Sequence, residues 1–312
     1  MVCQEDLVSN VCEIYDKLSN LDSLKPSKEV NMIFTNLVQL CVPPSPIEVT
    51  KLPQHVQEMR SKLIKICGEA EGLMESHYSA ILGSYESPLD HLHLFPYHTN
   101  YIKLGQLEFN ILSQHYTHPP KQIAFIGSGP LPLTSVVLAS NHLRNTTFHN
   151  YDIDASANSL ASELVSADAD LSQRMVFHTT DIMSVTDGLK EYEVVFLAAL
   201  VGMDKESKIK VIEHLSKHMA PGAILMLRSA HGARAFLYPV IDAADLVGFE
   251  VMSVYHPTDE VINSVVISRK TPMVVHTHDH HRIGGVFLPC KCSNIQGFGN
   301  GKNMMEELTV EE

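Results

Sequence analysis

Apolar side chains recur at helical spacing throughout the first 118 residues of the chain. Between residues 8 and 18, and again between residues 30 and 40, they stand three and four positions apart, which is the spacing of one helix face. Longer amphipathic stretches cover residues 53–82 and 101–116. The pattern therefore predicts an α-helical N-terminal domain over residues 1–118.

The pattern changes at residue 121, where short apolar runs begin to alternate with helical stretches. Strands are expected at residues 122–126, 146–151, 175–178, 194–198 and 223–227. Helices are expected at residues 131–143, 155–170, 206–218 and, after the fifth strand, 233–247. Strands that alternate with helices in this way predict a parallel, doubly wound sheet.

Two further strands, at residues 249–255 and 261–268, follow with only a polar turn between them. Since there is no room for a crossover helix, they are expected to form an antiparallel hairpin. A seventh strand added in this way is typical of S-adenosylmethionine-dependent transferases, and plain Rossmann oxidoreductases lack it. The predicted fold is therefore α/β, with a Rossmann-like transferase sheet of seven strands over residues 119–270 and its last hairpin antiparallel.

The remaining residues, 271–312, are rich in His and then in Gly, Asn and Glu. Such a composition predicts a polar, flexible tail. A metal site is the alternative, because clustered imidazoles can capture zinc, nickel or copper, although no predicted fold positions them.

The charge balance limits the partners of the chain. Its 312 residues include 23 Lys and Arg against 36 Asp and Glu, a formal net charge of −13, and no basic cluster interrupts that balance. Phosphate neutralisation needs a basic face, so nucleic acid is not an expected partner. The longest apolar runs, such as residues 194–201, fall well short of the roughly 20 residues of a membrane span, and none is expected.

The first residues and the cysteines indicate a reducing, cytoplasmic setting. The chain begins Met-Val-Cys-Gln-Glu-Asp, which is acidic where a secretory signal is basic and then apolar. The six cysteines are scattered, and none shows paired zinc-finger spacing. Tyr101-Ile-Lys-Leu104 fits a tyrosine-based sorting signal, which leaves vesicle association open, but helix packing explains these residues equally well.

Candidate chemistry begins directly after the first predicted strand, at Gly127-Ser128-Gly129-Pro-Leu-Pro132. Gly127 can turn the chain sharply off the strand, Gly129 lets the backbone approach a ligand, and Pro132 presets the first turn of the next helix. We expect Gly127, Ser128 and Gly129 to line a small-molecule pocket. With only two glycines, a purely structural turn between strand and helix is the alternative.

Acidic residues follow the next two strands. Asp152, about twenty-five residues after Gly127, is placed to accept hydrogen bonds from both hydroxyls of a ribose. Asp181 is placed to meet an adenine amino group, with a loop cap as its alternative. Asp154 is expected either to cap the next helix or simply to be solvated. Ligands at three consecutive strand ends predict an adenosine pocket on one edge of the sheet.

The pocket favours S-adenosylmethionine over a dinucleotide, because a diphosphate would call for a third glycine or a basic partner. After the fourth strand the chain reads Leu197-Ala-Ala-Leu-Val-Gly-Met203 and lacks the Asn/Asp-Pro-Pro-Tyr turn of many amino-group methyltransferases. Simple N-methylation therefore loses support. Another small-molecule methyltransferase stays an alternative, as does a protein that binds a nucleoside without turnover.

Several segments together resemble the plant nicotianamine synthase family. They are Ile126-Gly-Ser-Gly-Pro-Leu-Pro-Leu-Thr-Ser, Tyr151-Asp-Ile-Asp, Leu197-Ala-Ala-Leu-Val-Gly-Met, Leu227-Arg-Ser-Ala-His-Gly-Ala-Arg234 and Leu94-Phe-Pro-Tyr-His-Thr-Asn-Tyr-Ile-Lys-Leu104. The likeness covers residues 1 to about 270. It implies that three molecules of S-adenosylmethionine, as substrate, yield one nicotianamine and three methylthioadenosines without a required metal. Because the product chelates metals, the implied context is metal homeostasis.

A reaction of this kind needs a proton acceptor, since an attacking amine is protonated in water at neutral pH. The resemblance implies Glu75 and Tyr101 as the catalytic pair, because the family's catalytic Glu and Tyr match these positions. Glu71, one helical turn away on the same face, competes for the acidic role. The alternatives are a surface helix charge for Glu75 and a buried structural tyrosine for Tyr101.

Two residues after the fifth predicted strand complete the candidates. Arg228 can grip an amino-acid carboxylate with its fork of donors, and His231 in the same loop can contact substrate. An ion pair with a surface acid is the alternative for Arg228, and a loop histidine without catalytic work is the alternative for His231. Arg234 is expected in the first turn of the following helix. The sequence leaves the oligomeric state open, a homo-oligomer included.

Overall fold

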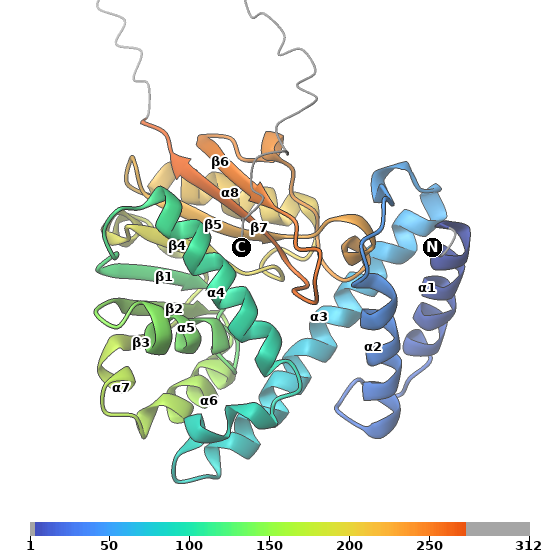
Figure 1. Cartoon of the computed structure of the whole chain (residues 1–312), viewed down its shortest axis with the longest axis horizontal. Helices are drawn as coiled ribbons and strands as arrows, with labels where there is room; N and C mark the ends of the chain where they lie inside the picture. The colour runs from blue at the N-terminus through green and yellow to red at the C-terminus, as the bar shows by residue number, and fades with distance from the viewer. Residues whose placement is uncertain (1–3, 273–312) are drawn as a thin grey trace, which may run out of the picture. The chain divides into compact units, whose positions relative to one another are not determined.

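A seven-stranded sheet forms the centre of the computed structural model, which describes residues 4–272 (Figure 1). The strands are β1 (Gln122–Ile126), β2 (Thr147–Asp152), β3 (Met175–Thr179), β4 (Val194–Leu197), β5 (Ile224–Ser229), β6 (Phe249–Tyr255) and β7 (Ser264–Lys270). Their order is β3-β2-β1-β4-β5-β7-β6, and β7 runs antiparallel to both β5 and β6. The predicted transferase sheet with an antiparallel last hairpin is confirmed.

The central strands β1, β4 and β5 are mostly apolar because both faces of the sheet are covered. Every residue of β4 and β5 is buried. On one face the sheet side chains pack with α4 (His98–His115) and α5 (Leu133–Val137), and on the other they pack with α8 (Lys205–His218). The sheet is thus fixed between two helical layers, and its carboxyl edge is held in place.

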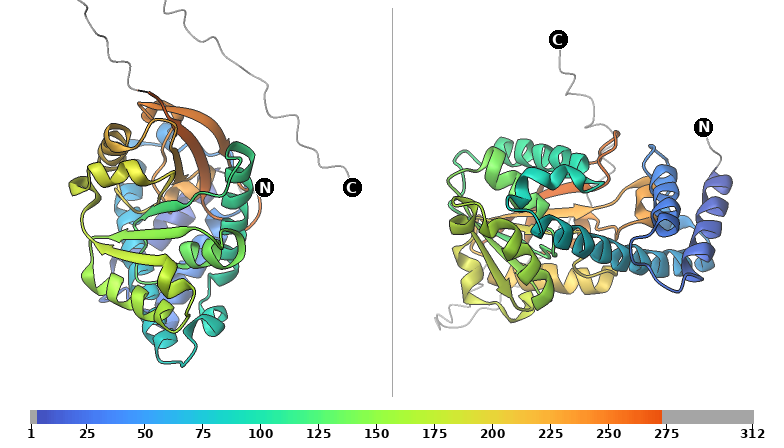
Figure 2. Two further views of the ribbon diagram at one scale, coloured as in Figure 1. Left: turned by 90° about the vertical axis from the view of Figure 1, so that its left-hand side faces the viewer. Right: turned by 90° about the horizontal axis from the view of Figure 1, so that it is seen from below.

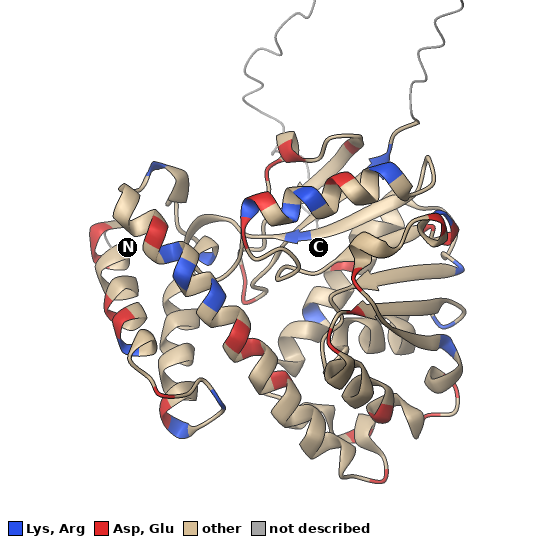
Figure 3. Ribbon diagram, turned by 180° about the vertical axis from the view of Figure 1, so that it is seen from behind, with Lys and Arg blue, Asp and Glu red and all other residues tan. Residues whose placement is uncertain are grey.

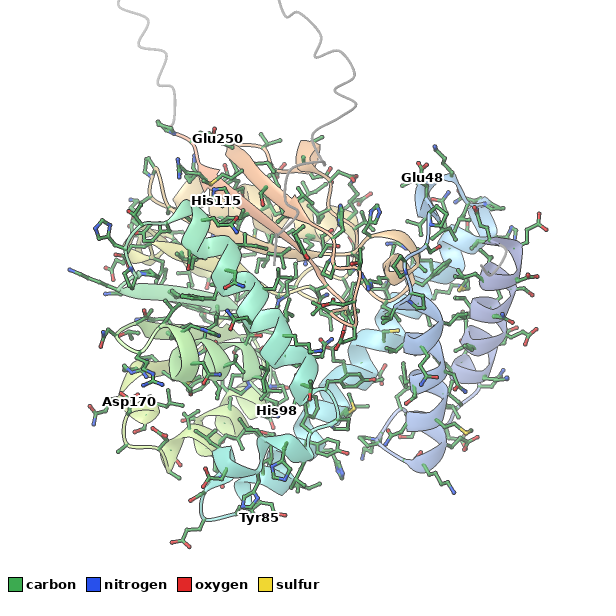
Figure 4. All side chains as sticks on the ribbon, viewed as in Figure 1. Glu48, Tyr85, His98, His115, Asp170 and Glu250 are labelled. Atoms are coloured by element: carbon green, nitrogen blue, oxygen red, sulfur yellow. The ribbon has the colours of Figure 1, made fainter. Side chains whose placement is uncertain are left out.

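Four longer helices precede the sheet or cross it. They are α1 (Gln4–Ser19), α2 (Lys28–Cys41), α3 (Gln54–Gly83) and α4, whose end residues His98 and His115 are labelled in Figure 4. In Figure 2, α1 and α2 lie at one end of this part of the chain, and α3 runs from them towards the sheet. Helix α3 contacts α1 near its start and α6 (Ala155–Ser166) beyond it, so it extends along the carboxyl edge of the strands.

The predicted helix over residues 233–247 is wrong. Two short 3₁₀ turns, Gly232–Phe236 and Ala243–Asp245, stand there instead. Pro239 lies between them, and a proline lacks the amide hydrogen that a helix needs and clashes with the preceding turn. The predicted helix over residues 131–143 is α5 followed by a single π turn, Leu138–His142.

None of the helices within residues 4–272 has the length and apolar character that crossing a membrane requires. The described elements belong to one compact unit, and the domain division at residue 118 stays a prediction. The predicted tail lies outside the described residues, apart from residues 271 and 272.

Candidate active site

A cavity of about 970 Å³ opens at the carboxyl edge of the parallel strands. One wall consists of the segments that follow β1, β2, β3 and β4, together with Arg228 in β5. The opposite wall comes from α3 and α4, which contribute Glu71, Glu75 and Tyr101. Figure 3 shows basic residues on the first half of α3 and acidic residues further along, where the helix passes the strand ends. Open α/β sheets bind ligands at this edge.

The turn after β1 brings backbone into the cavity. Gly127 and Gly129 have φ angles of 79° and 65°, which side chains with a Cβ rarely adopt. A Cβ on Gly129 would lie 2.7 Å from Oε2 of Glu75, so this glycine allows the Glu75 carboxylate to sit directly over the turn. Ser128 is buried, and its Oγ has no hydrogen-bond partner among the described residues. The three predicted turn residues all line the cavity.

The acidic residues after β2 and β3 line the same cavity. The Asp152 carboxylate accepts hydrogen bonds from the amides of Gly129 at 2.9 Å and Asp154 at 3.0 Å, which tie it to the turn after β1. Asp154 caps α6 as expected, accepting from the Ser156 amide. The Asp181 carboxylate accepts from the Met183 amide at 2.9 Å, so it caps a short 3₁₀ turn while it faces the cavity.

Glu75 and Tyr101 meet on the same wall of the cavity. The Tyr101 hydroxyl donates to Oε1 of Glu75 at 3.2 Å, although the residues are 26 positions apart. Glu75 is 9% exposed, so the surface-charge alternative is wrong. Burial raises the pKa of the Glu75 carboxyl well above its ordinary value, and the nearby Glu71 carboxylate adds to this rise. A carboxyl with a raised pKa accepts a proton more readily at neutral pH.

Glu71 lies on the same side of α3 and pairs with a different tyrosine. Its Oε2 accepts a hydrogen bond from the Tyr238 hydroxyl at 2.9 Å, and burial raises the pKa of its carboxyl. Two similar pairs, Glu75 with Tyr101 and Glu71 with Tyr238, are therefore the candidates for the proton acceptor. The glutamates lie one helical turn apart on the wall of one cavity.

Arg228 forms a buried ion pair. Its Nε donates to Oε1 of Glu108 at 2.7 Å, and its Nη2 donates to Oε2 of Glu108 at 3.0 Å and to the Thr134 hydroxyl at 2.6 Å. The partner is a buried acid of α4, 1% exposed, so the alternative of an ion pair with a surface acid is wrong. The Arg228 guanidinium carbon lies 6.0 Å from the centre of the Tyr101 ring, so the pair also supports one wall of the site.

Sequence reasoning missed Glu108 and Lys208. The Lys208 ammonium donates to the carbonyls of Ala198, Ala199 and Val201 at 2.7–2.8 Å and thereby holds the loop after β4 against the cavity. Both residues interrupt the apolar stripe of their helices, where Glu108 stands between Leu104 and Leu112. An ionisable residue on an otherwise apolar helix face is uncommon, and this could have identified both residues from the sequence.

The structure does not bring His231 to the cavity. Its side chain is exposed and stacks on His256 with ring centres 4.1 Å apart, and it is absent from the cavity lining within the described residues. A loop histidine without catalytic work fits this position. Arg234 lies in the 3₁₀ turn after β5 and donates to the carbonyls of Pro257 and Asp259, so it supports the loop before β7. Within residues 4–272, no group of three or more His, Cys, Asp or Glu forms a metal-binding cluster.

Comparison with known proteins places the chain in a family. The family model described as nicotianamine synthase protein matches residues 2–275. The chain belongs to the nicotianamine synthase family. It is 62% identical to nicotianamine synthase of Solanum lycopersicum and 58% identical to nicotianamine synthase 1 of Arabidopsis thaliana, with 100% of both chains covered in each case. As a nicotianamine synthase it transfers aminocarboxypropyl groups from S-adenosylmethionine, and its product connects it to metal homeostasis.

Solved structures support the fold of this nicotianamine synthase. A mutant of MtNAS in complex with S-adenosylmethionine has a TM-score of 0.69 at 21% identity and covers 85% of this chain and 98% of that chain. MtNAS in complex with MTA and tNA has a TM-score of 0.72 at 20% identity and covers 87% of this chain and 100% of that chain. The Rossmann-like sheet and the helices before it thus recur together.

Proposed function

We propose that the 970 Å³ cavity is where this chain carries out its synthesis, with S-adenosylmethionine bound across the ends of β1, β2 and β3. In this arrangement Asp152 accepts hydrogen bonds from the ribose hydroxyls, and Asp181 lies near the adenine amino group. Gly127 and Gly129 form the tight turn along which the nucleoside lies, and the unpartnered Ser128 hydroxyl is available to it. The complexes of MtNAS with S-adenosylmethionine and with MTA support this assignment.

Glu75 and Tyr101 act on the attacking amine in this proposal. The Glu75 carboxylate takes a proton from the ammonium group, and the freed nitrogen attacks the γ-carbon of the aminobutyrate arm of S-adenosylmethionine. A nitrogen–carbon bond forms, the carbon–sulfur bond breaks with its electron pair going to sulfur, and neutral methylthioadenosine leaves. Two linking transfers and one azetidine ring closure consume three sulfonium substrates and release three methylthioadenosines.

One observation supports these roles most strongly. The Glu75 carboxylate lies so close to the turn that Gly129 has no space for a Cβ, and Tyr101 holds the same carboxylate by a hydrogen bond. A nucleoside bound along the turn after β1 would place its sulfonium arm beside this pair. The arm that faces the nucleophile decides the product, because the sulfonium activates every attached carbon.

Arg228 has a more limited role than a free arginine. Its Nε and Nη2 already bind Glu108 and Thr134, whereas Nη1 makes no hydrogen bond within residues 4–272. We assign Nη1 to a substrate carboxylate and the remaining donors to keeping the guanidinium in place. The pair of hydrogen bonds to Glu108 is strong enough to fix the guanidinium, because bidentate pairing between arginine and a carboxylate is strong.

Product analysis tests this function. Pure protein incubated with S-adenosylmethionine should release methylthioadenosine and nicotianamine in a ratio of three to one, measured by mass spectrometry. Glu75→Gln should reduce turnover by about 10²- to 10⁴-fold while S-adenosylmethionine still binds in calorimetry. S-adenosylhomocysteine as the released nucleoside would contradict the transfer, and an equal loss of binding and turnover in Glu75→Gln would contradict the role of Glu75.

The compartment and the partners stay at the level of proposals. We keep the cytoplasm as the expected compartment and S-adenosylmethionine as the partner, and a homo-oligomer stays a prediction. The segment Tyr101-Ile-Lys-Leu104 lies inside α4, with Tyr101 on the cavity wall and Leu104 buried. Helix packing therefore accounts for it, and it gives no support to vesicle association.

A further inference from the structure

The loop after β4, residues 198–203, lines the cavity without a polar side chain. It reads Ala-Ala-Leu-Val-Gly-Met, and all of its residues belong to the cavity lining. Val201 lies against the turn after β1, because a Cβ on Gly127 would fall 2.2 Å from its Cγ2. Further along the same turn, Gly129 leaves room for the Glu75 carboxylate. An apolar wall and an acidic group therefore meet the turn at neighbouring glycines.

The same loop packs closely on two helices. A Cβ on Gly68 of α3 would lie 3.0 Å from Sδ of Met203 and 3.4 Å from Cδ2 of Leu200. Gly202 has a φ angle of 67°, and a Cβ there would lie 2.6 Å from the backbone of Lys208 in α8. The shape of this wall is thus fixed by contacts with the turn after β1, with α3 and with α8.

Lys208 points its charge into this loop rather than into solvent. It is 0% exposed, and its three ammonium donors are used by the carbonyls of Ala198, Ala199 and Val201, so none is left for a substrate. Burial lowers the pKa of Lys208 to about 7. The residue also lies close to the start of α8, where the helix dipole disfavours a cation. The position is unfavourable in two ways, and the hydrogen bonds that offset this all go to the loop.

The branches of S-adenosylmethionine differ in polarity. Its methyl group is apolar, whereas its aminobutyrate arm carries an ammonium and a carboxylate group. The wall of α3 and α4 offers Glu75 to an ammonium group, and Nη1 of Arg228 is assigned to a carboxylate. The loop offers no polar side chain, and three of its carbonyls are already bound by Lys208. Only the methyl group matches this wall, because burying an ammonium group without a partner is costly.

We infer that Lys208 is a positioning residue that decides which branch of the sulfonium faces the amine. By binding three carbonyls it keeps the loop wall apolar, the methyl group lies against that wall, and the aminobutyrate arm faces Glu75. This inference rests on the proposed function, in which Glu75 takes the proton from the attacking amine. Lys208 touches no substrate in this arrangement and acts only through the loop.

Lys208→Met tests this role, because methionine keeps an unbranched side chain and removes the ammonium group. The freed carbonyls can then accept from the substrate ammonium group and turn the methyl group towards the amine. Attack on the methyl carbon breaks its bond to sulfur and releases S-adenosylhomocysteine. The ratio of S-adenosylhomocysteine to methylthioadenosine should therefore rise by about ten-fold or more. KM for S-adenosylmethionine should change by less than about three-fold, because Asp152 and Asp181 stay in place.

Lys217→Met is the matched control, because Lys217 is an exposed lysine on the same helix. It should keep the nucleoside ratio of the parent, measured by chromatography with mass spectrometry. A lysine that only stabilised α8 would lower the amount of folded enzyme and leave the ratio as it was. An unchanged ratio in folded Lys208→Met would therefore overturn the inference, even if turnover fell.

Val201→Thr asks the same question without changing Lys208. Threonine keeps the shape of valine and adds only a hydroxyl to the apolar wall, so this variant serves if Lys208→Met does not fold. The same ratio should rise in it, by less than in Lys208→Met, and a ratio equal to that of the parent would also overturn the inference. Failure of the proposed function would show separately, as an unmodified chain that releases no methylthioadenosine.

Discussion

Glu75 and Gly129 belong to separate elements, yet each constrains the other. The carboxylate occupies the space that a Cβ on Gly129 would need, and the positive φ of the glycine forms the turn beneath it. The proposed nucleoside site and a buried acid thus share one point of contact. The single missing carbon at residue 129 is what allows both.

Gly129→Ala is expected to lower the free energy of unfolding by more than about 1 kcal/mol, because it adds a Cβ at positive φ against Oε2 of Glu75. The matched control is Gly72→Ala on α3, where an added Cβ meets nothing within 4 Å. That change should raise the free energy of unfolding by about 0.5–1 kcal/mol, since alanine favours a helix. Urea unfolding of both variants measures the difference, and equal values would contradict the close contact.

The raised pKa of Glu75 predicts how stability responds to pH. Between its ordinary value of 4.5 and the folded value, the folded state binds more protons than the unfolded state, so stability falls as pH rises through this interval. Glu75→Gln removes this loss. Its melting temperature should exceed that of the parent at pH 8, and the difference should shrink towards pH 4.5. A difference independent of pH would contradict the shift.

At the scale of elements, α4 connects the helical part of the chain to the sheet. Tyr101, near the start of α4, lines the cavity. Glu108, near the middle of the helix, pairs with Arg228 in β5. The ion pair therefore fixes the catalytic tyrosine of our proposal relative to the strand ends. The Lys208 ammonium does the same for the loop after β4.

Glu108→Gln is expected to lower the free energy of unfolding by about 3–5 kcal/mol, because it leaves the Arg228 charge buried without a counter-charge. The double variant Glu108→Leu with Arg228→Met should recover most of that stability, since apolar residues of similar size often replace a buried pair without loss. Denaturant unfolding measures both, and turnover should stay low in the double variant. A double variant as unstable as Glu108→Gln would contradict this explanation.

At the scale of the molecule, every residue of our proposed site lies within the span that the family model matches, residues 2–275. Removing residues 276–312 is therefore expected to change kcat and KM less than two-fold. Steady-state assays of methylthioadenosine release from the shortened and full chains test this. A larger loss would assign the last residues, which lie outside the described structure, a part in catalysis.

Much of the fold and part of the site follow from local patterns in the sequence. Helical spacing of apolar residues predicted most helices, and short apolar runs predicted the strands, because burial acts on neighbours in the chain. The missing helix after β5 has an equally local cause in Pro239, which the apolar pattern concealed. The glycine turn and the acids after β2 and β3 were visible because strand ends on one edge converge.

Only the tertiary structure decided which distant side chains meet. Nothing in local spacing pairs Arg228 with Glu108, 120 positions away, or Glu71 with Tyr238, 167 positions away. These pairs exist because helices packed on a sheet bring together residues that no periodic pattern relates, and burial then makes each unpaired charge costly. Sequence alone therefore determined the sheet and the family resemblance and predicted the nucleoside edge, whereas packing determined which tyrosine each glutamate of α3 meets.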